Sequence, residues 1–165
     1  MAMTLDEVMY AVHNRQFRVI ADVHLLLIAD GKVLLGQRAN TGYGDGAYHP
    51  PAGYLEAGES VVEALIRQAR DEIGITIQLK DVSFAHVMHN SSEDGEIALF
   101  FAVTTWAGEP VTMQPHKCSE LRWIPLHELP PNMIDYTRVA IRHYLEGKAF
   151  SAYPALRTGE NTRAY

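Results

Sequence analysis

The sequence predicts a mixed α/β fold, and three observations lead to this prediction. Two strand-forming runs, 17–28 and 32–38, flank an Asp30-Gly31 turn and predict a hairpin. A capped amphipathic helix is predicted over 60–74. Apolar segments then alternate with polar loops until a second helical pattern at 133–145. The order hairpin, helix, strands, helix is typical of an α/β fold with mixed sheets.

The first of these helices carries signals at both ends. Ser60 and Glu63 have the spacing of a capping box, and Gly74 stands where a helix often ends in a left-handed residue. Six apolar residues recur at helical spacing between them: Val61, Val62, Leu65, Ile66, Ala69 and Ile73. The sequence therefore predicts a helix with one face on the core.

The polar residues of this helix are less ordinary. At about 100° per residue, Gln68, Asp71 and Glu72 fall within an arc of roughly 100° at the border of the apolar stripe. Two carboxylates beside a carboxamide, half-turned toward a core, repel each other and resist desolvation. A hard cation with oxygen ligands would remove that cost, so the arc predicts a divalent cation site.

The remaining segments define the predicted organisation. One long strand or two shorter ones are expected over 75–89, with further strands at 96–106 and 121–124. A single domain is expected over 17–147, followed by a tail at 148–165 without a clear period. Residues 1–16 are predicted to hold a helix starting near Leu5. This helix is either an accessory, dimer-facing arm or a frayed end.

Composition limits the function classes. The 165 residues are 47% hydrophobic and 21% charged, which is typical of a soluble globular domain. The net charge of −6 argues against a broad nucleic-acid surface, and no stretch is apolar enough for a membrane span. Cys118 is the single cysteine and cannot form an internal disulfide, which suits a reducing compartment. A cytoplasmic location is expected.

Residues 53–75 resemble the signature of the Nudix hydrolase family, which is far more specific than a lone glycine pattern. Six positions carry the residues of that signature: Gly53, Glu59, Arg67, Glu72, Gly74 and Ile75. Asp71 replaces one of its paired glutamates conservatively. Gln68 replaces a glutamate by a neutral amide, which is a real departure. Looser similarity at 51–53 and 122–126 extends the resemblance to about residues 17–147.

The resemblance implies an α/β/α sandwich with mixed sheets, in which residues 53–75 form a loop-helix-loop. It also implies a divalent metal, Mg²⁺ or Mn²⁺, and attack by water on a phosphorus of a diphosphate linkage. By the same resemblance, the metal-ligand candidates are the Gly53 carbonyl, Asp71, Glu72 and the side-chain oxygen of Gln68. Such an ion polarises a phosphoryl oxygen and lowers the pKa of bound water.

Four side chains are candidates to support or perform catalysis. Arg67 lies one helical turn from Glu63 and Asp71 and can orient acids through charge-assisted hydrogen bonds. Glu59 is expected to be supporting or catalytic. Gln68 can bind metal but cannot act as a base. Either the site is weakened, or another acid has replaced the base, or Gln68 is an introduced change. Glu120 is the best replacement candidate, with a solvated loop glutamate as the equal alternative.

Two functions therefore follow from the sequence. The first is a metal-dependent pyrophosphohydrolase acting on a nucleoside triphosphate or another nucleoside-diphosphate derivative. The second is a weakened nucleotide-binding or regulatory module, which Gln68 suggests. Four side chains are candidates for contact with a base, with simple packing as their alternative role: Asn40, Tyr43, Tyr48 and Trp123. A monomer or homodimer is expected.

Overall fold

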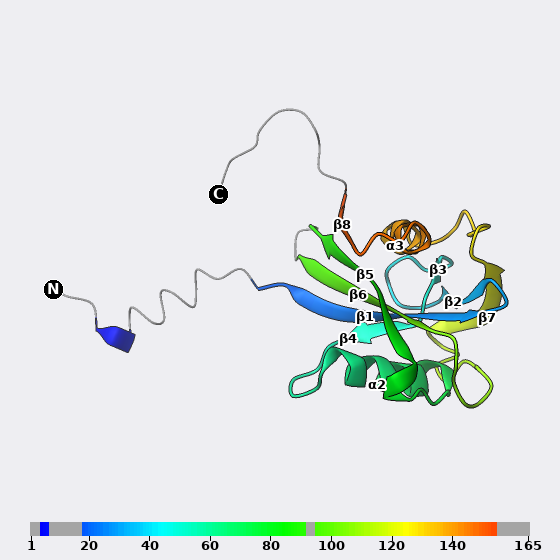
Figure 1. Cartoon of the computed structure of the whole chain (residues 1–165), viewed down its shortest axis with the longest axis horizontal. Helices are drawn as coiled ribbons and strands as arrows, with labels where there is room; N and C mark the ends of the chain where they lie inside the picture. Colours follow the sequence, from blue (N-terminus) through cyan, green and yellow to red (C-terminus); the bar gives the residue numbers. More distant parts are fainter. Residues whose placement is uncertain (1–3, 7–17, 92–94, 155–165) are drawn as a thin grey trace.

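The computed structural model describes residues 4–6, 18–91 and 95–154 (Figure 1). Its helices are α2 (Val61–Ile73) and α3 (Asp135–Leu145), with a short 3₁₀ turn at Leu79–Asp81. The strands, in chain order, are β1 (Ile20–Ala29), β2 (Lys32–Arg38), β3 (Tyr48–His49), β4 (Ala52–Tyr54), β5 (Val82–Asn90), β6 (Glu96–Val103), β7 (Cys118–Pro125) and β8 (Phe150–Tyr153).

The strands form one mixed sheet in the order β3-β2-β1-β6-β5-β8, with β4 paired to β1 and β7 to β2. Strand β1 runs parallel to β6 and antiparallel to β2 and β4. The register places Val23 opposite Gly53, so the glycine loop is attached directly to the central strand. The predicted hairpin and the predicted mixed sheet are both confirmed.

Two helices cover opposite faces of this sheet (Figure 1). Because side chains alternate along a strand, β1 supplies both cores. Val23, Leu25 and Leu27 pack with α2, whereas Leu26 packs with residues of α3. The predicted α/β/α sandwich is confirmed, and it leaves the polar side chains at the start of β1 on the α3 face.

Helix α2 begins and ends as its sequence predicts. The Ser60 hydroxyl accepts a hydrogen bond from the Glu63 amide, and the Glu63 carboxylate accepts one from the Ser60 amide at 2.7 Å. Gly74 has φ +70°, and its amide donates to the Ala69 and Arg70 carbonyls. These caps fix the ends of the helix and so fix which residues of its last turns face the sheet.

Three segments show what local patterns leave undecided. The apolar run at 75–89 divides into an isolated bridge at Thr76, the 3₁₀ turn and β5. No clear period marks the residues after Lys148, yet β8 pairs in parallel with β5. A four-residue strand is too short to show periodicity and depends on its partner. The predicted N-terminal helix lies almost entirely outside the described residues.

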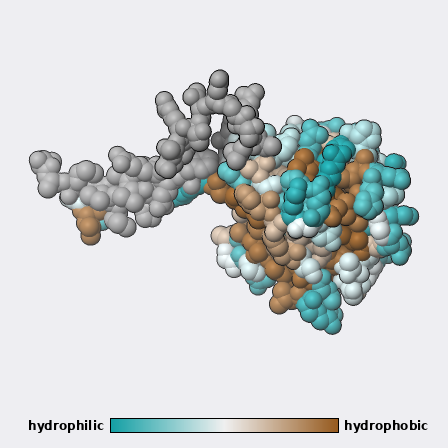
Figure 2. Space-filling view, turned by 45° about the horizontal axis from the view of Figure 1, so that its top comes forward, coloured by the Kyte–Doolittle hydropathy of each residue, from teal (hydrophilic) through white to brown (hydrophobic). Residues whose placement is uncertain are grey.

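The surface is mixed in character. Figure 2 shows apolar and polar residues interleaved over one face of the described part. Some large apolar side chains are exposed, Phe84 and Phe150 among them. Within the described ranges, no helix is long and apolar enough to cross a membrane.

Candidate active site

Glu72 joins the last turns of α2 to the sheet. Its Oε2 accepts a hydrogen bond from the Ala52 amide at 3.1 Å, and Ala52 belongs to β4 beside the central strand. Burial raises the pKa of Glu72 to about 7, and the bond from Ala52 opposes this rise. The structure therefore holds a half-buried carboxyl group whose charged form gains from a cation.

Gln68 lies directly against the glycine loop. A Cβ added to Gly53 would stand 1.8 Å from Gln68 Nε2 and 2.6 Å from its Oε1. Only a residue without a side chain permits this approach. The structure thus brings together Gly53, Gln68 and Glu72, three of the four predicted metal-ligand residues.

Arg67 fastens the loop before α2 onto the helix. Its Nη2 donates to Glu59 Oε1 at 2.6 Å and its Nε donates to Glu59 Oε2 at 3.0 Å. Nη2 also donates to the Tyr54 carbonyl at 3.1 Å. The Arg67 guanidinium lowers the pKa of Glu59. Arg67 therefore orients Glu59 rather than Glu63 or Asp71, its acidic neighbours on the helix. The Glu63 carboxylate accepts its hydrogen bond within the helix cap, and Asp71 accepts from Arg70.

Asp71 is the exposed member of the predicted set. Arg70 Nε donates to its Oδ1 at 2.9 Å, in a pair open to solvent. Every donor offered by Gly53, Gln68, Asp71 and Glu72 is an oxygen, which Mg²⁺ and Mn²⁺ prefer. Among the hydrogen bonds of the described residues, the Glu72 carboxylate accepts only the one from the Ala52 amide. The ligand atoms of these residues therefore have the chemical type that suits a hard divalent cation.

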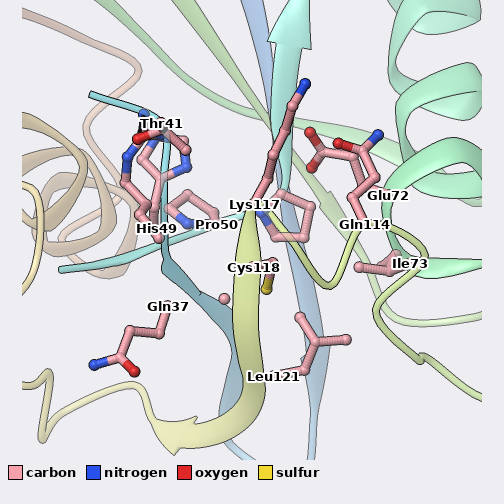
Figure 3. Close-up of a pocket in the computed structure, with 13 residues that line it drawn as sticks. Gln37, Thr41, His49, Pro50, Glu72, Ile73, Gln114, Lys117, Cys118 and Leu121 are labelled. Carbon is pink, nitrogen blue, oxygen red and sulfur yellow. Dashed lines mark hydrogen bonds between the residues drawn. The ribbon is translucent and has the colours of Figure 1, made fainter. Parts of the chain in front are cut away.

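Glu72 also lines a small cavity of about 80 Å³ between α2 and the sheet. Figure 3 shows Lys117 between Glu72 and Gln114 on one side and His49 on the other. Burial, with smaller contributions from His24 and Arg38, holds the pKa of His49 well below its ordinary value. His49 is therefore neutral at neutral pH.

A larger cavity of about 670 Å³ lies next to the small one. Four residues line both cavities: Arg38, Thr41, His49 and Lys117. The larger cavity extends to Asn40, Tyr43 and Tyr54 and to the start of β1. The Glu72 region and the larger cavity thus adjoin at a shared wall that contains two cationic side chains, Arg38 and Lys117.

The four predicted base-contact residues divide into two pairs. Asn40 and Tyr43 line the larger cavity; Asn40 donates to the His116 carbonyl at 2.9 Å, and Tyr43 is 62% exposed above Arg38. Tyr48 is buried in the core on the α3 side. Trp123 stacks on Trp106 in the other core, with ring centroids 5.9 Å apart. Neither Tyr48 nor Trp123 lines either of these two cavities.

Glu120 is held away from the two cavities. The Tyr48 hydroxyl donates to its Oε1, and Arg122 Nη2 donates to its Oε2 at 3.2 Å. The Tyr48 hydroxyl, and then the Arg122 charge, lower the pKa of Glu120. The structure does not bring this residue together with Gln68 and Glu72.

Sequence reasoning missed several residues that line the larger cavity: Asp22, Arg38, Glu96, Lys117 and Tyr136. One signal was available, because Asp22 and His24 interrupt an otherwise apolar strand. Burial, and then the neighbouring Asp22 carboxylate, raise the pKa of Glu96 to about 7. Arg38 and Lys117 carry no such signal, since loops and strand ends are ordinarily charged.

The class of protein follows from the architecture. It is an α/β/α sandwich in which the glycine loop and the acidic residues of α2 lie beside cavities lined in part by the cationic side chains Arg38 and Lys117. Comparison with known families gives the particular one. A model of the NUDIX domain matches residues 17–144, and the chain therefore belongs to the NUDIX family. Members of this family are hydrolases that act on diphosphate bonds.

Over the aligned residues, two curated relatives are somewhat more than a quarter identical to this chain. The NAD-capped RNA hydrolase NudC of Pseudomonas entomophila (strain L48) is 28% identical over 117 residues, which cover 71% of this chain and 41% of that protein. The ADP-ribose pyrophosphatase of Methanocaldococcus jannaschii is 28% identical over 120 residues, covering 72% and 69%. The match thus spans about two-fifths of the NudC relative's length.

Solved structures show the same fold. The MutT NUDIX hydrolase from Burkholderia pseudomallei superposes with a TM-score of 0.70 at 23% identity, covering 76% of this chain and 97% of that one. The MutT protein from Methanosarcina mazei Go1 has a TM-score of 0.66 at 22% identity, covering 80% and 96%. At this identity the likeness concerns the fold alone.

Proposed function

We propose that this protein hydrolyses a diphosphate linkage in a nucleoside triphosphate or another nucleoside-diphosphate derivative, with Mg²⁺ or Mn²⁺ at Gly53, Gln68, Asp71 and Glu72. The observation that carries the proposal is that the two cavities are adjacent and share lining residues. Glu72 lines one, Asn40 and Tyr43 line the other, and the residues between them include Arg38 and Lys117. A ligand with a charged diphosphate and an aromatic base has complementary groups along this path.

The chain's own residues have distinct parts in this proposal. Arg38 and Lys117 offset the charge of the diphosphate, and Tyr43 offers an aromatic face to a base. The Glu59–Arg67 pair keeps the glycine loop fixed on α2. A bound divalent cation would supply charge neutralisation and polarise a phosphoryl oxygen. The neutral His49, which lines the same small cavity as Glu72, adds no charge that would repel a cation bound there.

Gln68 favours a second candidate, a ligand-binding module with weak or absent hydrolysis. Its amide occupies the place against Gly53 where the family signature has a carboxylate, and an amide cannot accept a proton from water. Both candidates share the same cavities, so turnover separates them. The cytoplasmic location and the monomeric or homodimeric state remain predictions.

The test is a panel of nucleotides incubated with Mg²⁺ or Mn²⁺, with product release and ligand binding both measured. The panel includes ADP-ribose and NAD, because two relatives carry names that refer to them. We expect turnover that EDTA and Glu72→Gln abolish and that the exposed-loop control Glu128→Gln leaves unchanged. Binding without turnover across the panel would favour the ligand-binding module. The absence of both binding and turnover would reject both candidates.

A further inference from the structure

Asp22, His24 and Glu96 form a polar cluster on the face of the sheet opposite α2. Asp22 and His24 are two residues apart on β1, and Glu96 begins β6, the parallel neighbour of β1. Residues two apart on a strand share a face, and His24 stacks on Phe100 of β6 at 4.4 Å. All three therefore project from neighbouring strands, which are rigid supports for a site.

The three side chains converge closely. One ligand atom from each lies within 4.8 Å of the others. His24 Nε2 is 2.7 Å from Asp22 Oδ2, and Asn90 Nδ2 donates to Glu96 Oε2 at 3.0 Å. Donors bound to one ion at 2.0–2.2 Å stand about 3 Å apart. Small side-chain shifts would therefore bring this cluster to the spacing of a metal site.

A second observation concerns bonds that the cluster does not make. Asp22 is 5% exposed and His24 is fully buried, yet Asp22 Oδ1 and His24 Nδ1 have no hydrogen-bond partner in the described structure. Arg and Lys make no ion pair with Asp22 or Glu96 within residues 18–91 and 95–154. A buried carboxylate oxygen beside a second carboxylate is costly unless a cation, or a proton shared with Glu96, neutralises the pair.

We propose that Asp22, His24 and Glu96 bind a second divalent cation, a transition metal such as Zn²⁺ or Mn²⁺. Imidazole with two carboxylates suits these ions, whereas Mg²⁺ prefers oxygen ligands and retains its water. Asp22 and Glu96 line the larger cavity, so an ion bound by them would be reached from it. The bond from Asn90 fixes the orientation of Glu96, as outer hydrogen bonds do around metal ligands.

This site shares no residue with the set on α2 and is tested without turnover. The metal-stripped full chain is titrated with Co²⁺, whose visible absorption reports imidazole and carboxylate ligation, in excess Mg²⁺ to occupy the oxygen-ligand site. We expect one saturating Co²⁺ signal that competes with Zn²⁺. The isosteric variants Glu96→Gln and Asp22→Asn should abolish it, and Asn90→Ala should weaken binding about 10–100-fold.

The matched control is Asp71→Asn with Glu72→Gln, which should leave the Co²⁺ signal intact. Circular dichroism verifies that each variant is folded. If Asp22→Asn fails to fold, the more exposed Glu96 and Asn90 positions still decide the result. The proposal is overturned by the absence of a Co²⁺ signal in excess Mg²⁺, because the cluster then holds protons only. A signal that survives Glu96→Gln, or that disappears in the α2 control, overturns it equally.

Discussion

The contact between Gly53 and Gln68 gives a quantitative test of how the glycine loop meets α2. In Gly53→Ala, the new Cβ would lie 1.8 Å from Nε2 and 2.0 Å from Cδ of Gln68. Non-bonded carbon atoms stand about 3.5–4.0 Å apart, so the amide must retreat by roughly 1.5–2 Å. Since the obstructing atoms end a flexible side chain, we expect the free energy of unfolding to fall by about 1–2 kcal/mol, as for modest overpacking.

Urea denaturation of a double-mutant cycle measures this effect. Gln68→Ala removes the three atoms nearest the new Cβ, so Gly53→Ala should cost less than about 0.5 kcal/mol in that background. The coupling energy between the two positions should be near 1 kcal/mol. Equal costs of Gly53→Ala with and without the Gln68 side chain would refute the steric reasoning.

Three further perturbations test the site itself. Gln68→Glu should raise affinity for Mg²⁺ and raise kcat at least about tenfold. It is assayed beside Glu59→Gln and Glu120→Gln. An unchanged kcat of Gln68→Glu at saturating metal would reject the idea that a glutamate at position 68 would act as the general base. Because burial raises the pKa of Glu72 to about 7, affinity for Mg²⁺ should fall by up to about tenfold per pH unit below that value, and calorimetry showing a flat profile would contradict this. In EDTA, the pH dependence of the free energy of unfolding has the opposite direction. Because the folded-state pKa of Glu72 lies above the ordinary 4.5, the stabilising contribution of Glu72 is complete below pH 4.5 and is lost as the pH rises through about 7. The free energy of unfolding of Glu72→Gln, measured by denaturation in EDTA, should lack this decrease with rising pH. Lys117→Gln should raise KM roughly tenfold with kcat less affected, and the reverse pattern would exclude its proposed part in binding the diphosphate.

Much of the fold could be predicted because its signals are local. The capping box at Ser60, the left-handed Gly74 and the turn at Asp30-Gly31 act within a few residues, so their energetics are present in the sequence itself. Strand β8 could not be predicted, since four residues show no period and their hydrogen bonds go to β5. The site prediction divided in the same way. Gly53, Gln68 and Glu72 follow from motif spacing, whereas the position of Glu120 depends on its contacts with Tyr48 and Arg122.

The sequence by itself determined the family resemblance, the acidic helix and the departure at Gln68, because all of these lie within one continuous stretch. Only the tertiary structure decided that Arg38 and Lys117 join the Glu72 region to a larger cavity, and that Asp22 and His24 meet Glu96. The physical reason is strand pairing. Parallel β1 and β6 are separated by more than sixty residues of chain, and their side chains become neighbours only when the sheet forms.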